Sequence, residues 1–183
     1  MGIEKEQRIE EYAKAHYEDQ DQTHGIEHLE RTLKLAEHIA EIEDADKEIV
    51  RLGAILHQIH DSGQVKDFLE DLEIKSDTVE QIVHCVYCSD IENIDEAESL
   101  EAKVVYDADK LQVVGAFGVI REIACDIGER GKLFREAVQH SREIEQECFE
   151  TIQTETGRKI AEIHHDLLDE FWRKFDKMDK ADF

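Results

Sequence analysis

The sequence of 183 residues contains no proline, only nine glycines and no long apolar run. Proline and glycine are the residues that most often interrupt helices, so their scarcity leaves long helical stretches intact. Apolar residues recur at three- and four-residue spacings, and the alternating runs typical of strands are few. A membrane-spanning helix would need about 20 consecutive apolar residues, so no membrane association is expected. The sequence therefore predicts an all-α protein.

Positive charge is also scarce. The chain has 22 Lys and Arg against 46 Asp and Glu, which gives a formal net charge of -24. Such a chain would repel the backbone of DNA or RNA, so we do not expect a nucleic-acid polymer as its ligand. A small phosphorylated molecule is compatible with this charge, because a bound divalent cation can supply positive charge locally. We interpret most of the acidic excess as a solvated surface.

The four cysteines stand at positions 85, 88, 125 and 148. The spacing of Cys85 and Cys88 is that of half a zinc site or of a redox pair, but no second close pair completes a tetrahedron. Ordinary buried thiols are the favoured interpretation. Residues 1–6 are charged where a signal peptide would be apolar, so we expect a cytoplasmic protein with reduced thiols.

Composition does not change along the chain, so we expect one domain over residues 1–183. Apolar stripes and turn signals divide it into helices, and the third of these is expected to run through two histidines before Ser62 and Gly63 stop it. The predicted helices span about residues 3–18, 26–40, 46–60, 65–74, 77–87, 100–127, 133–153 and 156–177.

Three of these helices carry polar groups of the kind that bind metals. His28 lies beside the apolar stripe of the second helix, and His57 follows an apolar run in the third. Asp107 and Asp109 interrupt a strongly apolar stretch of a later helix. Burying such groups costs free energy unless a hydrogen bond or a metal compensates. Two imidazoles and a carboxylate suit Mn, Fe, Zn or Ni, although a single histidine in such a place is more often an ordinary core residue.

Several segments follow one another at recognisable intervals: HGIEHLER at 24–31, AILH at 54–57 and DADKL at 107–111. They resemble the motifs of the HD superfamily of metal-dependent phosphohydrolases. The single-domain branch that includes manganese-dependent nucleotide pyrophosphatases is more similar still, because GAFGVIR at 115–121 and TETGRKIA at 154–161 resemble its later motifs. The similarity covers most of residues 15–178 and implies an HD-domain helical bundle.

The resemblance also implies a set of metal ligands. His28 and His57 match the first two ligands, and Asp109 matches the last, with Asp107 as the alternative. Residues two apart on a helix point about 200° apart, so the two aspartates are not expected to bind the same ion. The implied cofactor is a divalent ion, one of Mn, Ni, Fe, Co or Mg. The implied substrate is a small phosphorylated molecule, with a nucleotide as the leading candidate.

Further roles carry over to residues near these ligands. Lys110 and Arg31 stand where basic residues can hold phosphate oxygens. Asp61 falls near an acidic position that assists proton transfer in related hydrolases. His60 and Gln112, where Gln112 replaces an acidic residue, are further candidates for binding the substrate.

The chain departs from the family at the aspartate of the His-Asp pair, where it has Gln58. A literal His-Asp pair occurs at His60 and Asp61, but the interval from His28 favours His57 as the match. One interpretation is that Asp61, at i+4 from His57, takes over as a ligand beside Gln58. The other interpretation is a site that has lost its metal.

A further departure is Cys88, a substrate-binding candidate that stands where the family has a histidine near the phosphate. His164 likewise stands where an arginine would precede the retained His165. The leading hypothesis is a metal-dependent phosphohydrolase, with a homodimer considered as its assembly. The alternatives are a noncatalytic HD-fold protein that binds a nucleotide or a protein partner, and a helical scaffold whose histidines make only core hydrogen bonds.

Overall fold

The computed structural model describes residues 2–18, 20–21 and 23–182, and this part of the chain is helical with no strand. The predicted all-α class is confirmed. A short 3-10 turn, η1, covers Ile94–Glu96. The α-helices are α1 Ile3–Glu18, α2 Ile26–Glu43, α3 Lys47–Leu56, α4 Ser62–Asp71, α5 Ser76–Cys88, α6 Leu100–Lys110, α7 Gly115–Gly128, α8 Phe134–Thr151 and α9 Glu155–Asp179.

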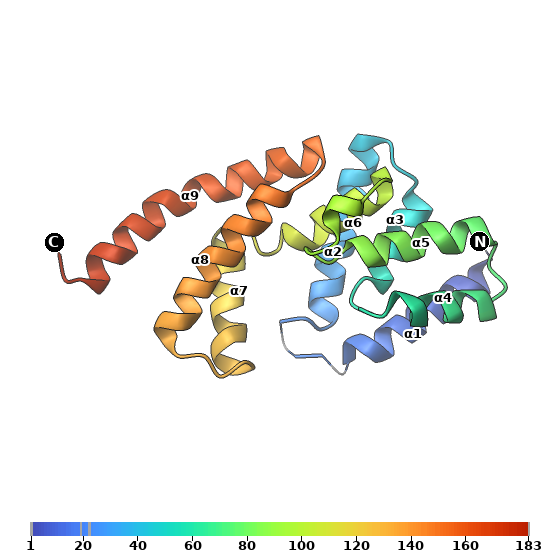
Figure 1. Cartoon of the computed structure of the whole chain (residues 1–183), viewed down its shortest axis with the longest axis horizontal. Helices are drawn as coiled ribbons and strands as arrows, with labels where there is room; N and C mark the ends of the chain where they lie inside the picture. Colours follow the sequence, from blue (N-terminus) through green and yellow to red (C-terminus); the bar gives the residue numbers. More distant parts are fainter. Residues whose placement is uncertain (1, 19, 22, 183) are drawn as a thin grey trace.

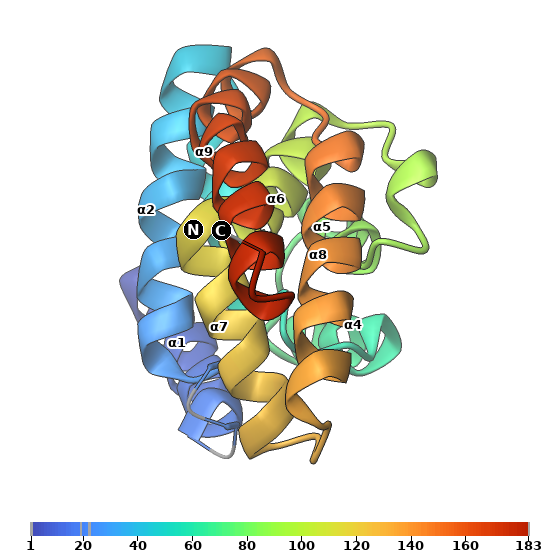
Figure 2. The same cartoon turned by 90° about the vertical axis from the view of Figure 1, so that its left-hand side faces the viewer.

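Helices α1 to α6 form the main body, in which α2 packs on α3 and α6 while α5 packs on α3, α4 and α6 (Figure 1). The largest buried side chains of this body include Tyr17, Ile39, Leu52, Leu69 and Tyr106. Helices α7 and α8 form a pair beside it, and α9 runs from α2 along this pair (Figures 1 and 2). The chain thus has two lobes of helices, α1 to α6 and α7 to α9, and a cavity with polar side chains lies between the two lobes.

Two predicted helices are shorter than expected. The third helix ends at Leu56 rather than at residue 60, and Asp61 starts α4 by accepting a hydrogen bond from the backbone N–H of Gln64 at 3.0 Å. The stretch predicted as one helix over residues 100–127 is divided into α6 and α7. The division falls at Gly115, whose φ of 83° is incompatible with a continuing right-handed helix.

All four cysteines are buried and unbridged, which confirms their interpretation as buried thiols. Among the described residues, no helix combines the length and the hydropathy needed to cross a lipid bilayer.

Candidate metal centre

The packing of α2, α3 and α6 brings three predicted ligands together. His28 lies in the first turn of α2, His57 directly follows α3, and Asp109 lies in the last turn of α6. All three side chains are buried. His28 Nε2 is 3.2 Å from His57 Nε2 and 3.2 Å from Asp109 Oδ1, and His57 Nε2 is 3.5 Å from the same oxygen. One donor atom from each residue therefore faces a common point.

This donor set fits a divalent ion. Around an ion bound at about 2.1 Å, neighbouring ligand atoms lie about 3.0–3.4 Å apart, close to the observed separations. Gln58 approaches the same point, because its Nε2 is 3.1 Å from His57 Nε2 and 3.3 Å from His28 Nε2. Rotating the Gln58 carboxamide by about 180° would place Oε1, instead of Nε2, at the point that the two imidazoles face. Such a neutral oxygen is a weaker ligand than the carboxylate that the family has at this position.

The two imidazoles can offer neutral lone pairs. His57 Nδ1 donates to the carbonyl oxygen of Ala54 at 2.7 Å, and in the neutral ring with this tautomer the lone pair is on Nε2. Burial lowers the pKa of His28 to about 4 despite the nearby Asp109 carboxylate, so this ring is neutral at pH 7. A neutral imidazole is the form that binds a metal.

Asp109 divides its two oxygens between the imidazoles and a lysine. Oδ1 faces the histidines, whereas Oδ2 accepts a hydrogen bond from Lys110 Nζ at 2.8 Å. Burial disfavours the charge on Asp109, but Lys110 and the histidines hold its pKa well below its usual range. Burial likewise disfavours the Lys110 ammonium, yet Asp109 raises its pKa. Both groups are therefore charged at neutral pH.

Behind His28 lies a group that can set its tautomer. His28 Nδ1 is 3.2 Å from Gln112 Oε1 and 2.9 Å from Arg121 Nη1. An imidazole that offers its Nε2 lone pair to an ion carries its proton on Nδ1 and can donate it to Gln112 Oε1, whereas Arg121 Nη1, which can only donate, favours the opposite tautomer. Gln112 is oriented by donating to Thr32 at 2.6 Å and by accepting from Arg31 Nε at 3.0 Å.

Asp107, the alternative ligand, points elsewhere. Its Oδ1 accepts from the Gln153 amide at 2.8 Å, and its Oδ2 accepts from the Thr154 amide at 2.7 Å and hydroxyl at 2.6 Å. Burial raises its pKa to about 6 despite these hydrogen bonds, and the carboxylate is fully buried. Asp107 therefore ties the start of α9 to α6, and of the two aspartates only Asp109 faces the histidines.

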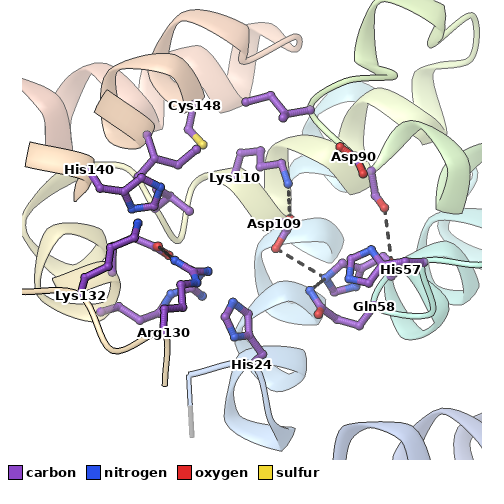
Figure 3. Close-up of a pocket in the computed structure, with 17 residues that line it drawn as sticks. His24, His57, Gln58, Asp90, Asp109, Lys110, Arg130, Lys132, His140 and Cys148 are labelled. Carbon is purple, nitrogen blue, oxygen red and sulfur yellow. Dashed lines mark hydrogen bonds and ion pairs between the residues drawn. The ribbon is translucent and has the colours of Figure 1, made fainter. Parts of the chain in front are cut away.

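A cavity of about 410 Å³ opens beside the metal centre, between the two lobes (Figure 3). Five of the predicted site residues line it, namely His57, Gln58, His60, Asp109 and Lys110, whereas the buried His28 lies behind them. Residues without a predicted role also line it, and among them are His24, Ser89, Asp90, Arg121, Glu122, Arg130, Lys132 and His140.

Besides His28, four predicted site residues lie outside this lining. Asp61 is exposed and caps α4, so the i+4 argument from His57 is wrong, because no helix joins the two residues. Cys88 is buried with its Sγ 3.6 Å from His84 Nδ1, which turns it away from the cavity. Arg31 and Gln112 lie behind His28 and contact each other. Both lie on the side of His28 away from the cavity lining, and their assignment to substrate binding stays a prediction.

Arg121 is the most informative residue that sequence reasoning left without a role. It belongs to the GAFGVIR segment that resembles a family motif, and this was the only available signal. The residues contributed by the end of α7, the α7–α8 loop and α8 had no such signal. They meet the metal centre only through the packing of the two lobes (Figure 3).

Comparisons with known proteins agree with this geometry. No family model matches the chain. The chain is 24% identical over 192 residues to the uncharacterized protein YpgQ of Bacillus subtilis, covering 96% of this chain and 94% of YpgQ. The match to the crystal structure of YpgQ in complex with ADP covers 93% of this chain and 96% of the YpgQ chain, with a TM-score of 0.75 at 24% identity.

Two further crystal structures are similar over nearly their whole length. A Lactobacillus plantarum protein has a TM-score of 0.85 at 23% identity and covers 100% of both chains. The match to an HD-superfamily hydrolase from Bacillus thuringiensis has a TM-score of 0.74 at 26% identity and covers 97% of this chain and 99% of that hydrolase's chain. The chain is thus a helical protein with a buried His-His-Asp group. Its fold is that of the HD superfamily, and the resemblance predicted from the motifs is confirmed.

Proposed function

We propose that this protein is a divalent-metal-dependent phosphohydrolase of a small phosphorylated substrate, with nucleotides as the leading substrate class. The observation that carries the proposal is the buried group of His28, His57 and Asp109, whose ligand atoms lie within 4.8 Å of one another. Its likeness to an HD-superfamily hydrolase supports the reaction class. The ADP bound to YpgQ supports a nucleotide as the substrate.

The proposal assigns a role to each group around the ion. His28, His57 and Asp109 would hold it, and Gln58 would offer a neutral oxygen. A divalent ion at such a site lowers the pKa of a coordinated water and polarises a phosphoryl oxygen. Lys110, charged beside Asp109 on the cavity wall, would bind a phosphate oxygen.

The proton acceptor in this proposal is His60 rather than Asp61. The Asp61 carboxylate is engaged at the start of α4, whereas His60 lines the cavity. Burial lowers the pKa of His60, so its ring is neutral at pH 7 and can accept a proton.

The test uses the purified chain loaded separately with Mn²⁺, Ni²⁺, Co²⁺, Fe²⁺ or Mg²⁺ and a panel of nucleotides. We expect release of phosphate or pyrophosphate with at least one ion. Asp109→Asn should lose both the ion and the product. Asp166→Asn, which makes the same change at an exposed position of α9, should retain both. Absence of product from the wild-type protein with every ion would refute the proposal.

Gln58 favours a second candidate, a protein that binds a nucleotide without hydrolysing it. A carboxamide beside two imidazoles removes one negative charge from the ligand set and weakens its hold on a cation. This candidate predicts little metal in the protein as isolated, nucleotide binding without product, and a gain of metal in Gln58→Asp. Metal analysis together with calorimetric titration of ADP separates the two functions.

A further inference from the structure

A second group of metal-ligating side chains lies where the two lobes meet. Asp21 and His24 belong to the segment between α1 and α2, whereas Cys125 lies on α7. One ligand atom from each of the three residues lies within 4.8 Å of the other two. The group shares no residue with the His-His-Asp centre, and it combines a carboxylate, an imidazole and a thiol. It therefore calls for an account of its own.

The segment before α2 holds the carboxylate and the imidazole in fixed positions. Asp21 Oδ1 accepts from the backbone N–H of Thr23 at 2.6 Å and from that of His24 at 3.1 Å, and Oδ2 is 2.7 Å from His24 Nδ1. Burial disfavours the charge on Asp21, but the hydrogen bonds from Thr23 and His24 lower its pKa to about 2. The carboxylate is therefore ionised at neutral pH and can bind a cation.

Cys125 brings a thiol to this group from the other lobe. The residue is buried and unbridged. Burial raises the pKa of its thiol, so the thiol keeps its proton at neutral pH when no cation is bound. A divalent cation displaces such a proton, because the thiolate is the form that binds a metal. The cation would also compensate the burial of the resulting negative charge.

The donor set selects the kind of cation. A thiolate with an imidazole and a carboxylate suits Zn²⁺, whereas Mg²⁺ and Mn²⁺ prefer oxygen ligands. Three protein ligands leave the fourth position of a tetrahedron for a water molecule. Asp21 Oδ2 and His24 Nδ1 would move apart by roughly 0.5 Å to share an ion in place of a proton. Their side chains are 22% and 21% exposed, which leaves room for this shift.

We infer that Asp21, His24 and Cys125 form a zinc site that joins the segment before α2 to α7. His24 lines the cavity, so an ion can reach the group from solvent (Figure 3). The ring centroids of His24 and His28 are 6.1 Å apart, so this site would lie beside the His-His-Asp centre and use separate ligands. The inference does not rest on the proposed hydrolysis.

The test follows cobalt bound to a thiolate. Full-length protein is treated with a chelator and a reductant, and is then titrated with Co²⁺, both as wild type and as Asp109→Asn. Both proteins should show the near-ultraviolet charge-transfer band of thiolate-bound cobalt, because the His-His-Asp centre contains no thiol. Added Zn²⁺ should bleach the band, since Zn²⁺ binds such sites more tightly than Co²⁺.

Cys125→Ser should lose the band and bind Zn²⁺ more than about tenfold more weakly, because even the loss of an outer partner of a ligand costs roughly 10–100-fold in affinity. His24→Gln should weaken Zn²⁺ binding similarly and serves as the test if Cys125→Ser does not fold. The matched control is Cys88→Ser. It makes the same change at a buried thiol whose Sγ is 3.6 Å from His84 Nδ1, and it should keep the band.

The outcomes separate the zinc site from the proposed reaction. No band in the folded wild type would overturn the zinc site, and so would a band that persists in folded Cys125→Ser or disappears in folded Cys88→Ser. A band that depends on Cys125 supports the zinc site even if no metal-loaded protein releases phosphate, in which case only the hydrolysis fails. Phosphate release by a wild-type protein without the band would leave the hydrolysis standing and overturn the zinc site alone.

Discussion

Replacing Asp107 by asparagine should test whether Asp107 has a structural role while Asp109 is the metal ligand of the DADKL segment. Asp107 Oδ1 accepts from the Gln153 amide, and Oδ2 accepts from the amide and the hydroxyl of Thr154. Asparagine has nearly the same shape but only one acceptor oxygen. If that oxygen accepts from Thr154, the new NH₂ group faces the backbone N–H of Gln153, and two buried donors then point at each other.

The expected cost follows from these contacts. A hydrogen bond to a charged group contributes roughly 1.5–3 kcal/mol, and a buried donor left unpaired costs about 1–3 kcal/mol. Because the two effects overlap at one position, Asp107→Asn should lower the free energy of unfolding by about 2–4 kcal/mol. For a chain of this size a loss of about 3 kcal/mol corresponds to a decrease in Tm of about 6–12 °C.

The assay pairs stability with metal content. Urea and thermal unfolding are followed by circular dichroism, and bound metal is measured at a temperature where the variant is folded. Asp107→Asn should unfold early but bind metal like the wild type, whereas Asp109→Asn should lose the metal. A folded Asp107→Asn protein with normal Tm and no metal would refute the assignment of Asp109 as the ligand.

Three further predictions concern other carboxylates and one close contact. Burial disfavours the charge on Asp126, but hydrogen bonds from Arg130, Lys132 and His140 lower its pKa in the folded protein. The ionised carboxylate therefore stabilises the fold above about pH 4, and this contribution is lost as the pH falls through the pKa of the folded state. Asp126→Asn should therefore lower the free energy of unfolding by about 1.5–3 kcal/mol at pH 7 and by less at pH 3; equal losses in urea titrations at both pH values would contradict this sign. Asp61→Ala should cost about 0.5–2 kcal/mol through the lost helix cap and leave metal content unchanged, and metal loss would return Asp61 to the site. Gly157→Ala would place its Cβ against Asp107 Oδ2, so a thermal scan should show a loss of about 1–3 kcal/mol, and an unchanged Tm would show that the contact relaxes freely.

Much of the candidate metal centre could be predicted because its residues break a local pattern. His28, His57 and Asp109 are polar groups in apolar helical stretches, and such groups need a partner or an ion wherever the helices pack. Helical periodicity alone did not decide between Asp107 and Asp109, because both interrupt the same buried run. The choice depends on which neighbours each carboxylate meets, and those neighbours are the α8–α9 loop for one and α2 with α3 for the other.

The end of the third helix shows a second limit of local patterns. The apolar spacing continues through Ile59, so a helix to residue 60 was the natural prediction. The chain instead leaves the helix after Leu56, and Asp61 caps the next one. This turn keeps His60 on the cavity wall and leaves Asp61 exposed, which reverses the roles that the i+4 spacing implied.

By itself the amino-acid sequence determined the helical class, the family resemblance and the identity of the buried ligand-type residues, because these depend on residue types and their spacing along single helices. Only the tertiary structure decided which aspartate faces the histidines and which wall of the cavity is basic. Arg130, Lys132 and His140 lie in ordinary polar segments of the sequence. Their shared position arises from the buried Asp126 and from the packing of α7 and α8 beside the main body, and neither leaves a periodic signal.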